Sequence, residues 1–184
     1  SPAAAAQFLL NGEVPPLGHK IIQTDLAKTL QAIAERGADG FYRGPVAQQL
    51  VQATRDAGGI WTLQELAEYQ VVEREPVVGT FMGHRVISAA PPSSGGVILV
   101  EMLNMLQQLK LDNYDSSDQV HLITEVMRRA YHDRARYLGD SDFVEVPVQR
   151  LIDPRHAAER IRDIDVHKAS VSRPMAQPSG QGQD

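Results

Sequence analysis

The sequence predicts an α+β fold that consists mainly of helices, with one short antiparallel pair of strands. Several segments repeat apolar residues at helical spacing between capping and stop signals, whereas β-branched residues gather in one stretch, residues 71–90. The 184 residues are 42% hydrophobic, which is enough apolar material for a globular core. Because no repeat or linker divides the chain, we expect one compact body followed by a loose tail, residues 170–184.

Composition excludes several classes of function. The net charge is 18 − 23 = −5 and the pI is about 5.7, which disfavours a nucleic-acid partner. The absence of cysteine excludes disulfides, cysteine-ligated metals and thiol nucleophiles. No apolar run reaches the roughly 18 residues of a membrane span. The first residues contain neither an initiator Met nor the features of a signal peptide, so we expect a cut or truncated product.

The first third of the chain predicts three helices in quick succession. Residues 24–36 place leucine and isoleucine at i, i+4 and i+7 before a stop at Gly37. A second helix opens at Gly44-Pro45, with proline in its first turn, and closes before two consecutive glycines. Thr62 and Glu65 form a capping-box pattern, which predicts a short third helix.

The expected strand pair lies in residues 71–90, with Gly83-His84 as its turn, and further helices follow it. Residues 97–109 are apolar on almost every side, which predicts a central helix buried against more than one neighbour. Ser116 and Gln119 suggest a capping box for the longest helix, which should continue almost to Gly139. Asp153-Pro154 begins a last helix.

The loop before the central helix is one candidate binding site. It contains Ser93, Ser94, Gly95 and Gly96, whose exposed amides at a helix start favour an anion. It lacks the lysine of a phosphate-binding P-loop and the G-x-S-x-G spacing of a nucleophile elbow. Two interpretations stay open here: a loop that binds a small anion, and a structural helix start in which the two serines cap free amides.

The long helix carries a possible metal-binding face. His121, Glu125 and His132 share one face, but Arg128 and Arg136 on that face oppose a cation. We therefore expect a solvated polar face and no metal site.

Two other charged groups have structural interpretations. Asp133 and Arg134 suggest a partly buried ion pair that ties the long helix to its neighbours. The acidic residues Asp140, Asp142 and Glu145 lack the ligand order of a calcium loop and suggest a turn. Composition and spacing alone give no catalytic constellation and no cofactor site.

Several strings together resemble the γ-glutamyltranspeptidase family. They occur in the family's order over roughly residues 17–168, and the combination of the last three is specific. The strings are Q-T-D-L-A-K-T-L at 23–30, G-F-Y-R-G at 40–44, A-G-G at 57–59, L-A-E-Y at 66–69, P-P-S-S-G-G at 91–96, Y-H-D-R at 131–134 and Y-L-G-D-S-D-F at 137–143.

The resemblance implies a place in a larger protein. It suggests a fragment of an N-terminal-nucleophile hydrolase αββα sandwich, with residues 1–169 from the second half of the large subunit. Residues 170–184 would be a flexible tail that leads to the self-cleavage site, with its boundary at Asp184. The family's nucleophile is the first threonine of the small subunit, and its carboxylate-binding arginine lies earlier in the large subunit. We therefore expect no catalytic residue in this chain, and no activity without the two missing parts.

The resemblance also implies an activity. Such enzymes cleave γ-glutamyl amides such as glutathione and transfer the γ-glutamyl group to water, amino acids or peptides, without a cofactor. A periplasmic or secreted location is expected from the same resemblance. Two alternatives stay open: a γ-glutamyl-type or cephalosporin-like acylase of the same superfamily, and a non-catalytic helical module that binds a small anion at residues 93–96.

Overall fold

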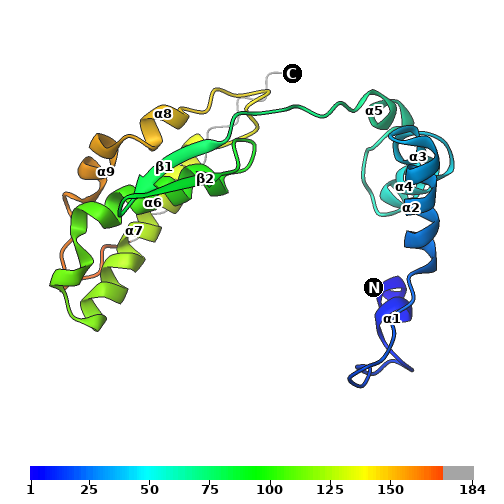
Figure 1. The fold of residues 1–184 in the computed structure, drawn as a ribbon, viewed down its shortest axis with the longest axis horizontal. Helices are drawn as coiled ribbons and strands as arrows, with labels where there is room; N and C mark the ends of the chain where they lie inside the picture. The colour runs from blue at the N-terminus through cyan, green and yellow to red at the C-terminus, as the bar shows by residue number, and fades with distance from the viewer. Residues whose placement is uncertain (172–184) are drawn as a thin grey trace. The chain divides into compact units, whose positions relative to one another are not determined.

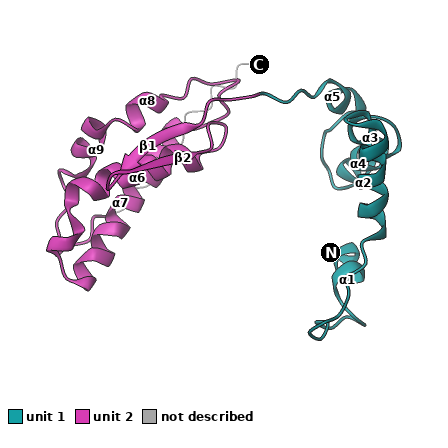
Figure 2. Cartoon of the chain, in the orientation of Figure 1, with its two compact units in different colours: residues 1–72 teal, residues 73–184 magenta. Residues whose placement is uncertain are grey.

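The computed structural model describes residues 1–171, in which helices predominate beside one two-stranded antiparallel sheet (Figure 1). The predicted α+β class is confirmed. The chain divides into two compact units, Ser1–Val72 and Glu73–Asp184 (Figure 2). The sequence had indicated one undivided body. Residues 69–76, at the division, form no helix or strand, but their valines give them the composition of a strand instead of a linker.

Unit 1 contains the three helices that the sequence predicts and two that it does not. Those not predicted are the first and the third, because Ser1 caps four consecutive alanines and Pro2 occupies the first turn, and because the third has one turn only. The helices are α1 (Pro2–Phe8), α2 (Thr24–Arg36), α3 (Asp39–Tyr42), α4 (Gly44–Asp56) and α5 (Leu63–Glu68).

Local signals fix the ends of these helices. Thr62 Oγ accepts a hydrogen bond from the Glu65 amide at 3.2 Å, and the Glu65 carboxylate accepts one from the Thr62 amide at 2.7 Å. The predicted capping box is thus confirmed. Helix α2 ends before Gly37, whose φ of 59° is easily reached only by glycine.

Unit 1 buries little of its apolar surface. Helix α4 contributes two buried residues, Ala47 and Val51. The predicted apolar face of α2 is present but uncovered, since Leu26, Leu30 and Ile33 are 47%, 56% and 36% exposed. A continuous apolar helix face of this kind normally packs against other protein segments.

Unit 2 begins with the predicted hairpin and continues with helices around it. Strand β1 (Val77–Phe81) pairs antiparallel with β2 (His84–Ser88), and the two-residue turn Met82-Gly83 has positive φ at both positions. The turn lies one residue before the expected Gly83-His84, because His84 already pairs with Phe81. The further elements are α6 (Gly95–Leu109), the 3-10 turn η1 (Leu111–Asn113), α7 (Ser116–Tyr137), α8 (Val148–Leu151) and α9 (Pro154–Ile161).

Helix α6 is the centre of unit 2, as its sequence predicts. It packs against both strands and against α7, α8 and α9 (Figure 1). On one side Val97 and Val100 join Val77 of β1 and Leu151 of α8. On another side Ile98 and Met105 join residues of α7 and α9. Burial on several sides explains why this helix is apolar nearly all round.

The start of α7 differs from the prediction. The N-cap is Asp115, whose carboxylate accepts hydrogen bonds from the amides of Ser117 and Asp118 at 2.9 Å each. Gln119 does not reach back but donates to the Leu111 and Tyr114 carbonyls. The capping box expected at Ser116 is therefore wrong, because an equally good cap precedes it by one residue.

Candidate functional site

The loop at residues 93–96 forms the start of α6 without the expected pair of side-chain caps. Ser94 is the N-cap residue, but its side chain makes no capping hydrogen bond. Its φ and ψ of −77° and −20° are helical, whereas a capping serine needs an extended backbone. Ser93 Oγ accepts a long hydrogen bond of 3.4 Å from the Gly95 amide. The capping prediction is therefore wrong for Ser94.

Ser94 instead receives a hydrogen bond from Arg134 of α7, across 2.9 Å between Nε and Oγ. The sequence had paired Arg134 with Asp133, which is wrong, because neighbouring residues on a helix point about 100° apart. A guanidinium donates and cannot take up a proton. Among residues 1–171, neither Ser93 nor Ser94 is hydrogen-bonded to a carboxylate or an imidazole that could act as its base.

The two glycines of the loop have different roles. A Cβ on Gly96 would lie 2.2 Å from the carbonyl oxygen of Ala89, so the backbone can approach this closely only at a glycine. A Cβ on Gly95 would meet nothing nearer than the Ser93 Oγ at 3.6 Å. The Ser-Ser-Gly-Gly string thus has a packing explanation at Gly96 and none at Gly95.

Four ionisable side chains from three helices form a cluster in which all but Arg160 are buried, and the sequence did not predict it. It consists of Glu101 from α6, Asp133 from α7, and His156 and Arg160 from α9. His156 Nε2 lies 3.0 Å from an Asp133 oxygen and 3.6 Å from a Glu101 oxygen. Arg160 Nε lies 2.9 Å from the same Asp133 oxygen. The available signal was a single acidic residue within the apolar stretch 97–109.

Glu101 is fully buried, and this burial raises its pKa to about 9. The neighbouring Asp133 carboxylate raises the pKa further, while Arg160 opposes the shift. Burial also works against the charge of Asp133, but the contacts with Glu101, Arg160 and His156 lower the pKa of that carboxyl. Glu101 therefore carries a proton at neutral pH, although among the described residues neither of its buried oxygens has a hydrogen-bond partner.

Glu101, Asp133 and His156 could also be considered as metal ligands, because one ligand atom of each lies within 4.8 Å of the others. However, the Arg160 guanidinium already supplies a positive charge to the Asp133 oxygen that a metal would need. The proton on Glu101 removes the negative charge of the second carboxyl group. We therefore assign this cluster a structural, proton-holding role.

A second buried cluster lies elsewhere on α7, around Glu125. The sequence placed Glu125 on a solvated face with His121 and His132, which is wrong for Glu125, because it is only 1% exposed. His121 instead contacts the Asp165 carbonyl at 2.8 Å, and His132 lies 3.4 Å from Asp133. The three residues do not converge on one point.

The Glu125 carboxylate is held by several donors. Arg129 Nη1 donates to it at 2.6 Å, Ser170 Oγ at 2.5 Å and the Ser170 amide at 3.1 Å. Burial alone would raise the pKa of Glu125, but the hydrogen bonds with Ser170 and Arg129 lower it to about 2. Arg128 also pairs with this carboxylate, at 2.8 Å. Glu125 is therefore an ionised residue whose hydrogen-bond and ion-pair partners belong to the same chain.

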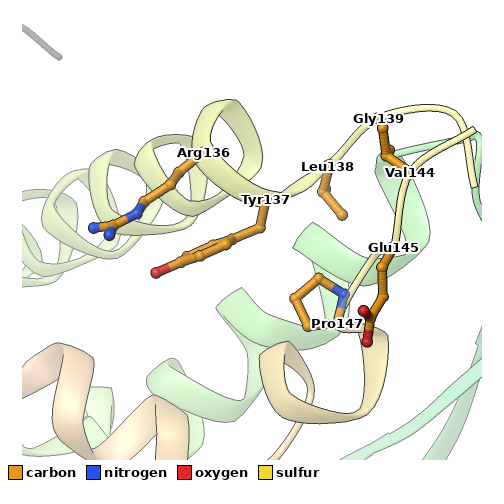
Figure 3. Close-up of a pocket in the computed structure, with 7 residues that line it drawn as sticks. All are labelled: Arg136, Tyr137, Leu138, Gly139, Val144, Glu145 and Pro147. Atoms are coloured by element: carbon orange, nitrogen blue, oxygen red, sulfur yellow. The ribbon is translucent and has the colours of Figure 1, made fainter. Parts of the chain in front are cut away.

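The acidic residues after α7 form a turn, as the sequence favoured. Both Asp142 oxygens accept from Arg74 Nη2 at 2.7 Å, and Asp140 accepts from the Asp142 amide at 3.0 Å. Glu145 lines a surface hollow of about 500 Å³ beside the end of α7 (Figure 3). Arg150 lies over the ring of Tyr137, another lining residue, at 4.8 Å.

The hollow offers little chemistry. Its charged lining residues are Arg136 and Glu145, which lie at opposite sides of it (Figure 3). None of its lining residues is a serine, threonine, histidine or lysine, and Glu145 is its one carboxylate, so a nucleophile and a base are not brought together here. Asp184, the predicted cleavage boundary, lies outside the described residues. Within residues 1–171, no helix is both long enough and apolar enough to cross a membrane.

A family model, curated proteins and solved structures were compared with this chain, and all three comparisons find related proteins. The family model described as Gamma-glutamyltranspeptidase matches residues 1–183. A glutathione hydrolase proenzyme of Escherichia coli (strain K12) is 41% identical over 169 residues, which cover 91% of this chain and 29% of the relative. An acylase ACY 1 proenzyme of Pseudomonas sp. (strain SE83) is 37% identical over 170 residues, 91% of this chain and 30% of the relative.

Among solved structures, the γ-glutamyltranspeptidase of Helicobacter pylori superposes with a TM-score of 0.82 and 37% identity. That match covers all of this chain and 54% of the solved chain. The chain thus spans about 30% of the length of the curated relatives it matches. The matches therefore cover nearly all of this chain but only part of each relative.

Proposed function

The chain belongs to the γ-glutamyltranspeptidase family, and from this membership we propose that it is the second half of the large subunit of a γ-glutamyltransferase/hydrolase. The whole protein would cleave γ-glutamyl amides such as glutathione and pass the γ-glutamyl group to water, amino acids or peptides. The observation that carries the proposal is the match of residues 1–183 to the family, together with relatives named as glutathione hydrolase proenzymes.

The proposed reaction uses a threonine on a partner segment. Its hydroxyl attacks the γ-glutamyl carbonyl while its own free α-amine takes the proton, and the amine product leaves with a proton. The resulting γ-glutamyl ester is then attacked by water or by an acceptor amine, which releases the product and restores the hydroxyl. The free α-amine exists only after the preceding peptide bond is cut, so cleavage of a proenzyme would activate the enzyme.

Two observations support a nucleophile outside this chain. In the part of the chain that the structure describes, Ser93 and Ser94 have no base, and the buried cluster around Asp133 is occupied by its own ion pairs. The uncovered apolar face of α2 supports further segments of the same protein as partners, since these would cover it. By family resemblance we also propose a periplasmic or secreted location.

The test uses the full-length proenzyme that contains this chain. We expect it to cut itself into two chains and then to hydrolyse a chromogenic γ-glutamyl anilide and glutathione. A glutaryl amide, which lacks the α-amino group of the γ-glutamyl unit, serves as the comparison substrate and should be cleaved much more slowly. Preference for the glutaryl amide would favour the acylase alternative, and absence of both cleavage and turnover would contradict the proposal.

A further inference from the structure

The last described part of the chain is fastened to α7 by both backbone and side chain of one residue. The Ser170 amide donates to Glu125 Oε1 at 3.1 Å, and its hydroxyl donates to Glu125 Oε2 at 2.5 Å. The same hydroxyl accepts from Arg129 Nη2 at 3.2 Å. Three hydrogen bonds to two ionised and nearly buried side chains make this an unusually strong attachment for a residue outside any helix or strand.

The side chains that hold Ser170 are themselves fixed. Arg129 Nε donates to the Arg160 carbonyl at 2.7 Å, and Arg129 Nη2 pairs with Asp163 at 2.8 Å. These contacts connect the attachment to α9 and to the turn after it. Glu125 and Arg129 therefore form a rigid platform whose position does not depend on Ser170 alone.

The attachment involves Ser170 but not the residue that follows it. Val171, the next residue, is 83% exposed. The apolar core formed by α6, α7 and α9 does not include Ser170. The attachment therefore adds little to burial of the core, and its direct effect is to fix the point and direction from which the chain continues.

We propose that Glu125 and Arg129 are positioning residues for self-cleavage, because they hold Ser170 at the start of the segment that leads to the bond to be cut. This inference rests on the proposed function. If the cut follows Asp184, fourteen residues separate it from Ser170, a reach of at most about 50 Å. A fixed starting point confines the bond to a smaller volume and so raises its effective concentration at the reacting threonine.

Loss of the attachment would move the fixed point back along the chain. The nearest earlier polar contact with another element is that of His167 Nδ1 with Asp118 Oδ1 of α7, at 3.9 Å. The length of chain between the fixed point and a cut after Asp184 would then grow from 14 to 17 residues, which by loop-closure entropy alone slows closure by about 1.3-fold. Misplacement of the bond adds to this, since displacements of about 1 Å can slow a reaction by up to about 100-fold.

The test replaces Ser170 in the full-length proenzyme. Ser170→Ala removes the hydroxyl, Ser170→Thr keeps one, and Ser170→Val has the shape of threonine without the hydroxyl. Ser117→Ala, at an exposed position on α7, is the matched control. Self-cleavage is followed by gel electrophoresis of purified precursor, the cut site by mass spectrometry, and kcat of the processed enzyme with a γ-glutamyl anilide.

We expect Ala and Val at position 170 to slow self-cleavage at least about 1.3-fold, and up to about 100-fold. Thr should restore most of the rate, and kcat of the processed enzyme should not change. Cleavage of Ser170→Ala and Ser170→Val at the wild-type rate would overturn the inference. So would equal losses of cleavage rate and kcat, because these would indicate a general structural role. If the wild-type precursor itself is not cut, the proposed function fails first.

Discussion

Arg134 Nε donates a hydrogen bond to Ser94 Oγ across 2.9 Å, and this contact joins α7 to the start of α6. The two residues are forty positions apart in the chain. Ser94 therefore accepts a hydrogen bond from a cationic side chain. This is a structural role, since a nucleophilic serine needs a partner that takes its proton.

Ser94→Ala in the processed enzyme should therefore lower stability by about 0.5–1.5 kcal/mol, the usual contribution of one hydrogen bond. Ser93→Ala is the matched control and should stay within about 0.5 kcal/mol of wild type, because its single contact is 3.4 Å long. Urea unfolding followed by circular dichroism measures both. Loss of activity in Ser94→Ala without loss of stability would instead place Ser94 in the active site.

Gly96→Ala should destabilise the protein by about 1–3 kcal/mol or more, because the added Cβ would meet backbone, which cannot rotate away. Gly95→Ala places a methyl group in open space and should change stability by less than about 0.5 kcal/mol. Thermal unfolding of the two variants gives the comparison. Equal effects would show that the glycines are required by something other than the approach to Ala89.

The raised pKa of Glu101 predicts that the free energy of unfolding falls as the pH becomes alkaline. Its pKa in the folded protein, about 9, lies above the ordinary value of 4.5, so the folded state binds the proton more tightly than the unfolded state. The contribution of this proton to stability is complete below pH 4.5 and is lost as the pH rises towards 9. Asp133, whose pKa is lowered, acts in the opposite direction, and only below about pH 4.

Glu101→Gln keeps the shape and the hydrogen-bond donor but has no proton to lose. We expect it to remove part of the decline in the free energy of unfolding between pH 5 and pH 9. Urea unfolding at several pH values measures this slope for both proteins. An unchanged slope would contradict the buried proton, and so would a large rise in melting temperature on addition of Mn²⁺ or Zn²⁺, which would indicate a metal site.

The lowered pKa of Glu125 predicts that the free energy of unfolding falls as the solution becomes acidic. Its pKa is lowered from 4.5 to about 2, so its contribution to stability is complete above pH 4.5 and is lost as the pH falls towards 2. Glu125→Gln leaves Arg129 without its buried partner and should cost up to about 3–5 kcal/mol at pH 7. The difference from wild type should shrink between pH 4.5 and pH 2. A constant difference over this range would show that Glu125 is not ionised in the folded protein.

The features that could be predicted from sequence are those fixed by neighbouring residues. Thr62 and Glu65 cap one helix within a span of four residues, and Asp153 caps α9 through the Arg155 amide two residues later. Such signals depend on local spacing alone, so they predicted the helices α2, α4 to α7 and α9 and the hairpin. The family resemblance, also a property of the sequence, indicated the enzyme class.

The features that could not be predicted depend on contacts between distant segments. Glu101 meets Asp133 and His156 only after three helices pack together, and no spacing between them indicates this. Glu125 is buried because Ser170, forty-five residues later, returns to it. The sequence predicted an apolar face on α2, but this face is uncovered within unit 1, and helical spacing alone does not indicate which segment packs against it.

We propose that the reacting nucleophile lies outside these 184 residues. The most direct measurement is covalent labelling of the processed full-length enzyme with an electrophilic γ-glutamyl analogue, followed by peptide mass spectrometry to locate the adduct. We expect one adduct, on a threonine at the N-terminus of a separate chain and on no residue of positions 1–184. An adduct on Ser93, on Ser94 or on any other residue of this chain would contradict it.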